Sequence, residues 1–154
     1  MTLVFVILVM VMKMRVYYVF PMKEEFAQLY QNSPRTLYNI LRQIYYMHKE
    51  DVHYGFNLFQ QIIERMEKNK LDQQLFLRLH QEMDYSKRGN FHYINNLYRD
   101  EVSTLEIKNT HMKIETNHDF SSFFRILDTD RTNYFVCDFV EQDYFWLKEI
   151  KTLV

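Results

Sequence analysis

Glycine, proline and cysteine are scarce in this sequence of 154 residues, and each scarcity excludes a class of protein. The two glycines, Gly55 and Gly89, are far apart, whereas phosphate-binding loops and dinucleotide-binding fingerprints need several glycines close together. Only two prolines break the chain and no interdomain linker is visible, which predicts one domain. The single cysteine, Cys137, excludes an intrachain disulfide and a cysteine-based zinc site, and its apolar neighbours predict a buried side chain. Nothing implies an oxidising compartment, so we expect a cytoplasmic protein.

The sequence also lacks an excess of charge of either sign. It has 19 basic and 20 acidic residues, a net charge of −1, and the basic residues alternate with acidic ones. Proteins that bind nucleic acids usually concentrate basic residues in a patch, because neutralising phosphates dominates their affinity. We therefore expect no direct binding to nucleic acid. The hydrophobic content of 47% predicts a folded core rather than a disordered chain.

No pattern of catalytic or metal-binding residues is recognisable. His48 and His53 are five residues apart, on different faces of a helix. The segment that starts at Asp128 resembles a calcium loop at first, but Asn133 replaces the glycine at its sixth position and Phe139 the glutamate at its twelfth. No serine has the flanking glycines of a nucleophile elbow. We expect no metal, no cofactor and no enzymatic activity.

Residues 1–12 form a run of apolar and uncharged side chains. About 20 apolar residues are needed to cross a bilayer, so the run is short for a membrane span. Lys13 and Arg15 follow it, whereas a secretory signal has its basic residues first. Three interpretations are open: residues 1–13 are a dispensable extension or lie upstream of the true start, they are a weak membrane anchor, or they add an element to the domain. The first is favoured, with a domain over 14–154, and membrane association is the minor alternative.

The first half of the chain predicts one strand followed by helices. Residues 16–20 are β-branched and aromatic, which predicts a buried strand that Pro21 ends. A helix is expected over 22–31, another from the Ser33–Pro34 start signal, and a third after Asp51. Residues 75–79 are assigned to a helix, with a strand as the alternative.

The second half predicts hairpins. Residues 104–107 and 112–116 read as one hairpin, and residues 133–139 and 144–148 as a second, with Trp146 in the core. Between them, His118 and Asp119 are expected to cap a short helix whose buried stripe starts at Phe120. Helices early and strands late predict a single α+β domain.

The helix over 22–31 has an apolar arc wider than a surface helix needs for its core. Met22 and Leu29 are expected to face inward, and Phe26 and Tyr30, one turn apart, to lie at the edge of the arc. An exposed aromatic pair at this spacing is a good anchor for a partner protein. The other interpretation is that all four side chains fill the core, and the residues alone leave both open.

Both ends of the chain resemble the SirA family, the sporulation inhibitors of replication of endospore-forming bacteria and their relatives. The resemblance rests on Val16-Tyr-Tyr-Val-Phe-Pro-Met-Lys-Glu-Glu-Phe-Ala27 followed by Tyr30, and on Cys137-Asp-Phe139 followed by Tyr144, Trp146 and Leu147. It runs from about Val16 to the end of the chain and is loose from about Tyr45 to Asp100. The family's start falls near Met14, which supports treating the preceding residues as extraneous.

The resemblance implies a function. Members bind the N-terminal domain of the replication initiator DnaA and so restrain initiation, by covering a surface rather than by chemistry. The family's contact residues include an aromatic pair that matches Phe26 and Tyr30, and a glutamine that matches Gln60, with Gln61 as the alternative. On this basis Phe26 and Tyr30 are expected to be partly exposed.

Overall fold

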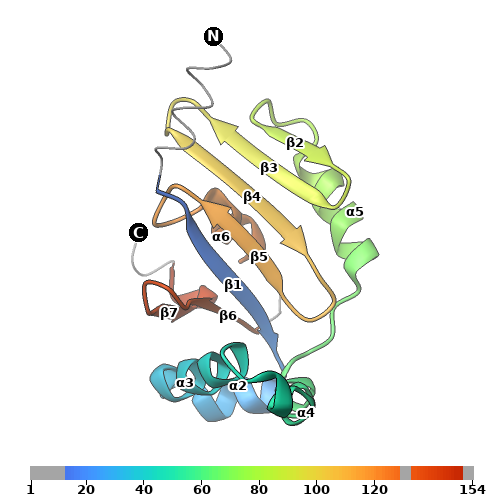
Figure 1. Cartoon of the computed structure of the whole chain (residues 1–154). Helices are drawn as coiled ribbons and strands as arrows, with labels where there is room; N and C mark the ends of the chain where they lie inside the picture. Colours follow the sequence, from blue (N-terminus) through green and yellow to red (C-terminus); the bar gives the residue numbers. More distant parts are fainter. Residues whose placement is uncertain (1–12, 129–132, 151–154) are drawn as a thin grey trace.

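The computed structural model describes residues 13–128 and 133–150, which contain one antiparallel sheet of seven strands (Figure 1). The strand order is β2-β3-β4-β5-β1-β6-β7. The strands are β1 (Arg15–Met22), β2 (Tyr85–Arg88), β3 (Phe91–Asn96), β4 (Glu101–Ile107), β5 (Met112–Thr116), β6 (Asn133–Asp138) and β7 (Asp143–Trp146). Because β1 pairs with β5 on one side and with β6 on the other, the N-terminal strand lies inside the sheet.

Strand β1 contributes to two cores, one on each face of the sheet. Its side chains alternate, so Tyr17 and Val19 belong to one buried cluster and Phe20 to the other. The predicted strand is confirmed, but Pro21 does not end it. Pro21 pairs with Tyr134 of β6, and its carbonyl accepts a hydrogen bond from the backbone N–H of Glu64 at 2.7 Å. A proline lacks only the backbone donor, so its acceptor can still join a ladder.

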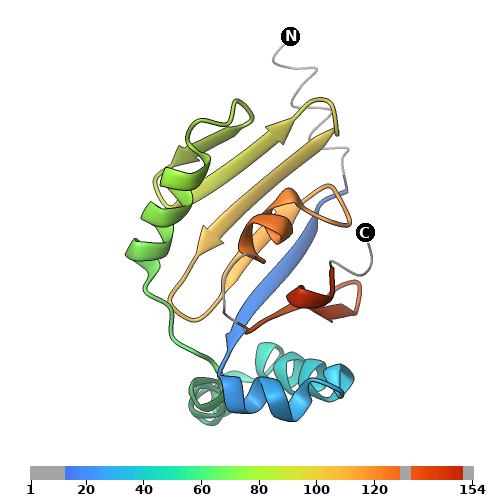
Figure 2. The same cartoon turned by 180° about the vertical axis from the view of Figure 1, so that it is seen from behind.

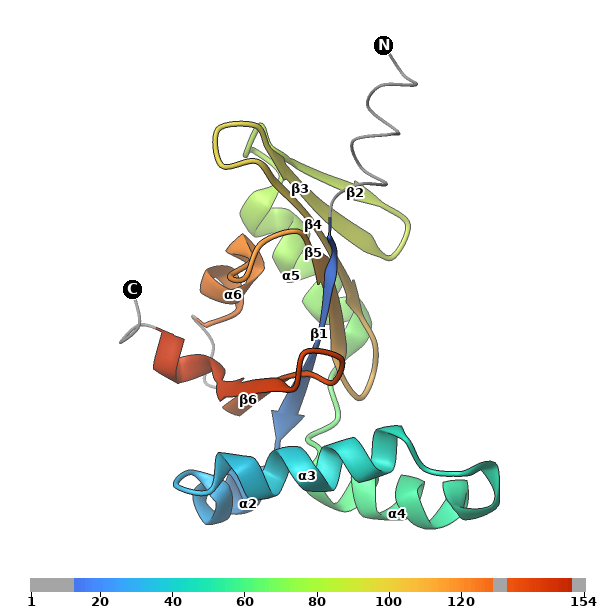
Figure 3. The same ribbon diagram turned by 60° about the vertical axis from the view of Figure 1, so that its left-hand side comes forward.

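Three helices lie together at the end of the sheet where β1 ends (Figures 1 and 3). They are α2 (Glu24–Tyr30), α3 (Pro34–Tyr45) and α4 (Val52–Ile62), and the short 3₁₀ turn η1 (Lys49–Asp51) precedes α4. We call them the helical layer. Helix α3 begins at Pro34, as predicted, and buries Leu37 and Leu41. Helix α2 begins two residues later than expected, because Met22 is still part of β1, where it is buried.

Two further helices, α5 (Lys68–Leu79) and α6 (Ser122–Leu127), cover one face of the sheet (Figure 2). Leu75 and Leu79 of α5 and Phe123 and Phe124 of α6 are buried in the same cluster as Tyr17. The helix assigned to residues 75–79 is therefore confirmed.

The predicted cap of α6 is wrong by two or three residues. Ser121 is the N-cap, and its Oγ accepts a hydrogen bond from the backbone N–H of Phe123 at 3.2 Å. The Asp119 carboxylate instead accepts a hydrogen bond from Arg15 at 3.0 Å. Because the helix starts late, Phe120 lies outside its buried stripe and is 44% exposed.

Both predicted hairpins are confirmed, as β4–β5 and β6–β7. Trp146 is buried, with its ring centroid 4.8 Å from that of Phe135, and Cys137 is fully buried. The predicted α+β class is also confirmed. The hairpin β2–β3 was not predicted, and with η2 (Leu147–Glu149) it completes the described elements.

Candidate partner-binding site

Helices α2 and α4 are joined where β1 ends. The backbone N–H of Lys23, just before α2, donates to the carbonyl of Ile62, the last residue of α4, at 3.0 Å. The adjacent residues Met22, before Lys23, and Ile63, after Ile62, form an antiparallel bridge. The first turn of α2 therefore lies beside the last turn of α4, so that Phe26 and Gln60 belong to one layer although 33 residues separate them in the sequence.

Phe26 and Tyr30 lie between core and solvent. Both side chains are partly buried, and both pack against the cluster that contains Phe20 and Leu37. Ala27, on the inner side of α2, is the one residue of this helix that is buried. Each aromatic side chain thus stabilises the helical layer with one part of its surface and leaves another part accessible.

Leu29 lies on the solvent-exposed side of α2. The side chain is 66% exposed, so the prediction that Leu29 faces inward is wrong. A helix of seven residues has room for only a narrow inner stripe, and Ala27 and the two aromatic rings occupy it. An exposed leucine therefore lies next to the half-exposed pair.

Gln60 is exposed in the last turn of α4. It follows Phe56 by one turn, and Phe56 is itself 50% exposed. Gln61 is also exposed, so both glutamines are accessible and the choice between them stays open. The inner side of α4 carries Gly55 and Ile62, which are buried.

A second group of polar residues lies deep in the structure, where α5 meets the β2–β3 hairpin. His92 Nε2 is 2.8 Å from Asp72 Oδ1, and His92 Nδ1 is 2.7 Å from the Tyr85 hydroxyl. All three residues are buried. Burial lowers the pKa of His92 despite the nearby carboxylate, and burial raises the pKa of Tyr85 to about 12. No pattern in the sequence predicts this chain of hydrogen bonds, which fastens the hairpin to the helix.

A third polar group surrounds Arg15. Its guanidinium donates to Asp138 and Asp119 at 3.0 Å each and to Asp143 at 3.2 Å, and it lies 4.6 Å from the centre of the Tyr17 ring. These contacts tie the start of β1 to the β6–β7 turn and to the loop before α6. One cation shared among three carboxylates thus holds these segments together, so this group is structural.

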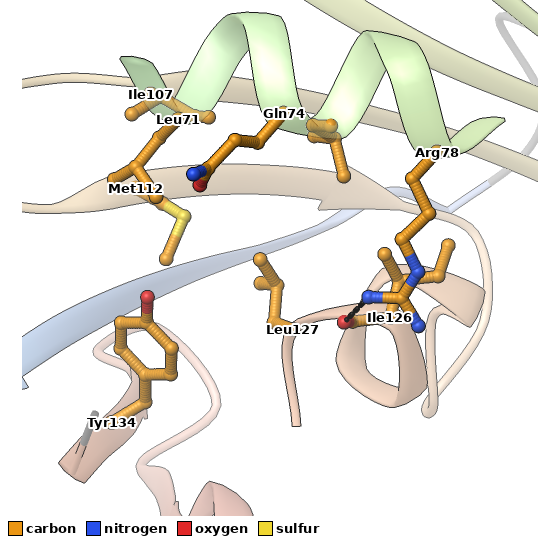
Figure 4. Close-up of a pocket in the computed structure, with 9 residues that line it drawn as sticks. Leu71, Gln74, Arg78, Ile107, Met112, Ile126, Leu127 and Tyr134 are labelled. Carbon is orange, nitrogen blue, oxygen red and sulfur yellow. Dashed lines mark hydrogen bonds between the residues drawn. The ribbon is translucent and has the colours of Figure 1, made fainter. Parts of the chain in front are cut away.

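The structure also contains an apolar cavity of about 220 Å³ between α5, α6 and the sheet (Figure 4). Arg78 lies at one end, where it donates to the carbonyl of Ile126 at 2.8 Å. The described residues that line the cavity contribute no carboxylate, histidine or cysteine. They are Leu71, Gln74, Leu75, Arg78, Ile107, Met112, Ile126, Leu127 and Tyr134. Such a lining offers no pair of groups for acid–base chemistry.

Within residues 13–128 and 133–150, no three His, Cys, Asp or Glu side chains gather as metal ligands would. The segment compared above with a calcium loop includes residues 129–132, which lie outside the described residues, as do residues 1–12. None of the described helices has the length and hydrophobicity to cross a bilayer.

The residues of the sheet and of the helices match a known protein family. A family model described as "Sporulation inhibitor of replication protein SirA" matches residues 15–151, which include every described helix and strand. A search of curated proteins finds no match.

Proposed function

Because the chain belongs to the SirA family of sporulation inhibitor of replication proteins, we propose that it binds the N-terminal domain of the initiator DnaA and thereby blocks initiation. The proposed site is the surface of α2 and α4 that carries Phe26, Tyr30 and Gln60. The protein acts in the cytoplasm, where the initiator works, and it uses no cofactor.

The observation that supports this proposal best is the position of Phe26 and Tyr30. They match the aromatic contact pair of the family, and part of each ring is exposed on the helical layer. Aromatic side chains with this environment dominate many protein interfaces, because they bury a large area and lose little conformational entropy. Their inner contacts hold the rings in place before the partner arrives, which reduces the entropic cost of binding.

The proposed mechanism is steric. A protein that covers the DnaA surface used for self-association or helicase recruitment blocks initiation by affinity alone. An ordinary interface of about 1,200–2,000 Å² is sufficient for such a complex. No bond is made or broken, so the inhibition is reversible once the inhibitor is removed.

Calorimetric titration of the purified chain against the DnaA N-terminal domain tests the proposal. We expect a one-to-one complex, and we expect Phe26→Ala and Tyr30→Ala each to weaken it by about 2 kcal/mol, or some thirtyfold. Thermal unfolding of the same variants separates binding from folding. Because part of each ring packs on the core, an interface role predicts a loss of stability of about 1–2 kcal/mol, whereas a pure core role predicts a loss of about 3–5 kcal/mol.

The two results lead to different conclusions. Folded variants that bind as tightly as the wild type would remove the aromatic pair from the interface. A wild-type chain that shows no heat of binding would contradict the proposed function itself.

A further inference from the structure

Leu29 adds to the apolar surface that α2 exposes to solvent, beyond what Phe26 and Tyr30 contribute. At 100° per residue it lies about 60° around the helix from Phe26, on the side away from Tyr30. Single exposed leucines are common on protein surfaces and do not by themselves indicate a binding site. This one follows Phe26 by three residues, a spacing that makes the two side chains neighbours on the helix surface, so it extends the partly exposed aromatic pair.

Glu25 lies on the same flank of α2. It precedes Leu29 by four residues, so the two side chains are neighbours on the helix surface. Glu25 is exposed, and no cation among the described residues lies within ion-pair distance of it. Glu24 has the same charge but lies on the other flank, where it lines a hollow with Gln28 and Trp146.

We propose that Leu29 is a main apolar anchor of the DnaA interface and that Glu25 beside it steers the encounter. This inference rests on the proposed function and refines it. The proposal requires that the contacted surface of DnaA has an apolar recess for Leu29 and a basic side chain beside this recess. Leu29 contributes to the lifetime of the complex, because desolvated apolar anchors act mainly on dissociation. Glu25 contributes to the association rate, because a charge at the rim acts before contact.

Leu29 is also a cleaner probe of the interface than Phe26 or Tyr30. Truncating an aromatic ring that packs on the core disturbs the helical layer as well as the partner contact. Two thirds of Leu29 is exposed, so Leu29→Ala removes little surface that folding has buried. The chain offers a matched control in Leu77 of α5, which is 59% exposed and lies outside the helical layer.

The test is surface plasmon resonance on immobilised DnaA N-terminal domain from the same organism, with wild-type chain, Leu29→Ala, Leu77→Ala, Glu25→Gln and Glu24→Gln. We expect Leu29→Ala to dissociate about tenfold faster with little change in association, and Leu77→Ala to behave as wild type. We expect Glu25→Gln to associate about threefold more slowly at low salt, with its dissociation rate unchanged and its salt dependence reduced. Glu24→Gln should keep most of the wild-type rate.

The outcomes separate this inference from the proposed function. If Phe26→Ala weakens binding but Leu29→Ala dissociates like the wild type, the function stands and Leu29 is not an anchor. Equal effects of the two leucine substitutions would also overturn the assignment. Equal effects of the two glutamate substitutions would show that overall charge, and not Glu25, sets the association rate. A wild-type chain that does not bind at all would overturn both proposals.

Discussion

Trp146 is the residue whose burial the sequence predicts most directly, and its environment gives a testable magnitude. Its side chain packs in the same cluster as Leu37 and Phe135. Its indole Nε1 is buried without an acceptor in the described part of the chain, so the ring stabilises the fold by packing and not by hydrogen bonding. We expect Trp146→Ala to lower the free energy of unfolding by about 3–5 kcal/mol, measured by urea denaturation. Trp146→Phe keeps an aromatic ring and loses no hydrogen bond, so it should cost clearly less. An unchanged urea midpoint for the alanine variant would mean that Trp146 lies outside the core.

His111 makes the stability of the protein depend on pH. Its ring lies 5.9 Å from those of Tyr18 and Phe20, and burial lowers its pKa to about 4, with Lys108 as a further cause. Lys113 also lowers the pKa, whereas Glu106 raises it. In the unfolded chain the pKa is about 6.5, so between pH 6.5 and pH 4 the unfolded state binds more protons than the folded state. Stability is therefore lost as the pH falls through this window, and above pH 6.5 the imidazole has no effect.

We expect the contribution of His111 to make the protein about 2 kcal/mol less stable at pH 5 than at pH 7. His92, whose pKa is also lowered by burial, acts in the same direction, so the test compares variants. His111→Gln should reduce the difference between urea midpoints at the two pH values. His53→Gln, at an exposed position of α4, is the control and should leave the difference unchanged. Identical pH dependence in both variants would contradict a role for His111.

At the scale of elements, the sequence predicts those whose side-chain pattern has one clear period. Strand β1 is recognisable because its centre is a run of β-branched and aromatic residues. Helix α3 is recognisable because a serine at the N-cap position and a proline mark its start. Strands β2 and β3 were missed because their inner faces are not simply apolar. Strand β2 buries only Tyr85, and β3 buries His92 beside Ile94, so a polar residue occupies a core position.

One signal for the missed hairpin was present in the sequence. Gly89 and Asn90 separate β2 from β3, and a Gly–Asn pair between two strands is typical of a two-residue hairpin turn. Gly89 has a φ of +58°, a conformation that a residue with a side chain seldom adopts. The buried contacts that hold this hairpin to α5 were not predictable, because Asp72 and His92 are 20 residues apart.

The attachment of the β2–β3 hairpin to α5 depends on Asp72. In the neutral imidazole of His92, Nε2–H donates to the Asp72 carboxylate and Nδ1 accepts from the Tyr85 hydroxyl, since a carboxylate can only accept. Asp72→Ala leaves a buried N–H without a partner, and we expect it to cost about 1–3 kcal/mol in the free energy of unfolding. Hydrogen exchange should quicken first for backbone amides of residues 85–96. Asp72→Asn keeps an acceptor and should be milder, and equal exchange in all three proteins would show that the hairpin does not depend on this contact.

At the scale of the whole molecule, the residues before β1 should be dispensable. The ladder of β1 with β5 begins at Arg15, that with β6 begins at Tyr18, and the matched family region also begins at Arg15. The described contact of Lys13 is an ion pair with Glu141 between exposed side chains, which contributes little. A chain that starts at Met14 should therefore unfold cooperatively, with a melting temperature close to that of the full chain. Loss of a cooperative thermal transition would show that the apolar N-terminal residues belong to the core.

The candidate site was only partly predictable from the sequence. Periodicity identifies the apolar arc of α2, but it cannot decide which side chains a helix of seven residues leaves exposed, and it placed Leu29 wrongly. The meeting of α2 and α4 depends on backbone hydrogen bonds between residues about 40 positions apart, for which no local pattern exists. The partner comes from the family resemblance, because an interface made of ordinary surface residues has no motif of its own.

The proposed function requires this protein to stop replication by acting on DnaA. The most direct measurement is the ratio of origin to terminus DNA in growing cells in which the chain is induced. We predict that the wild-type chain lowers the ratio toward one in cells whose origin needs DnaA, and that Tyr30→Ala, produced at the same level, lowers it much less. Cells that replicate from an origin independent of DnaA should keep their ratio when the wild-type chain is induced. An equal fall in both kinds of cell would contradict the account, because the chain would then inhibit replication without DnaA.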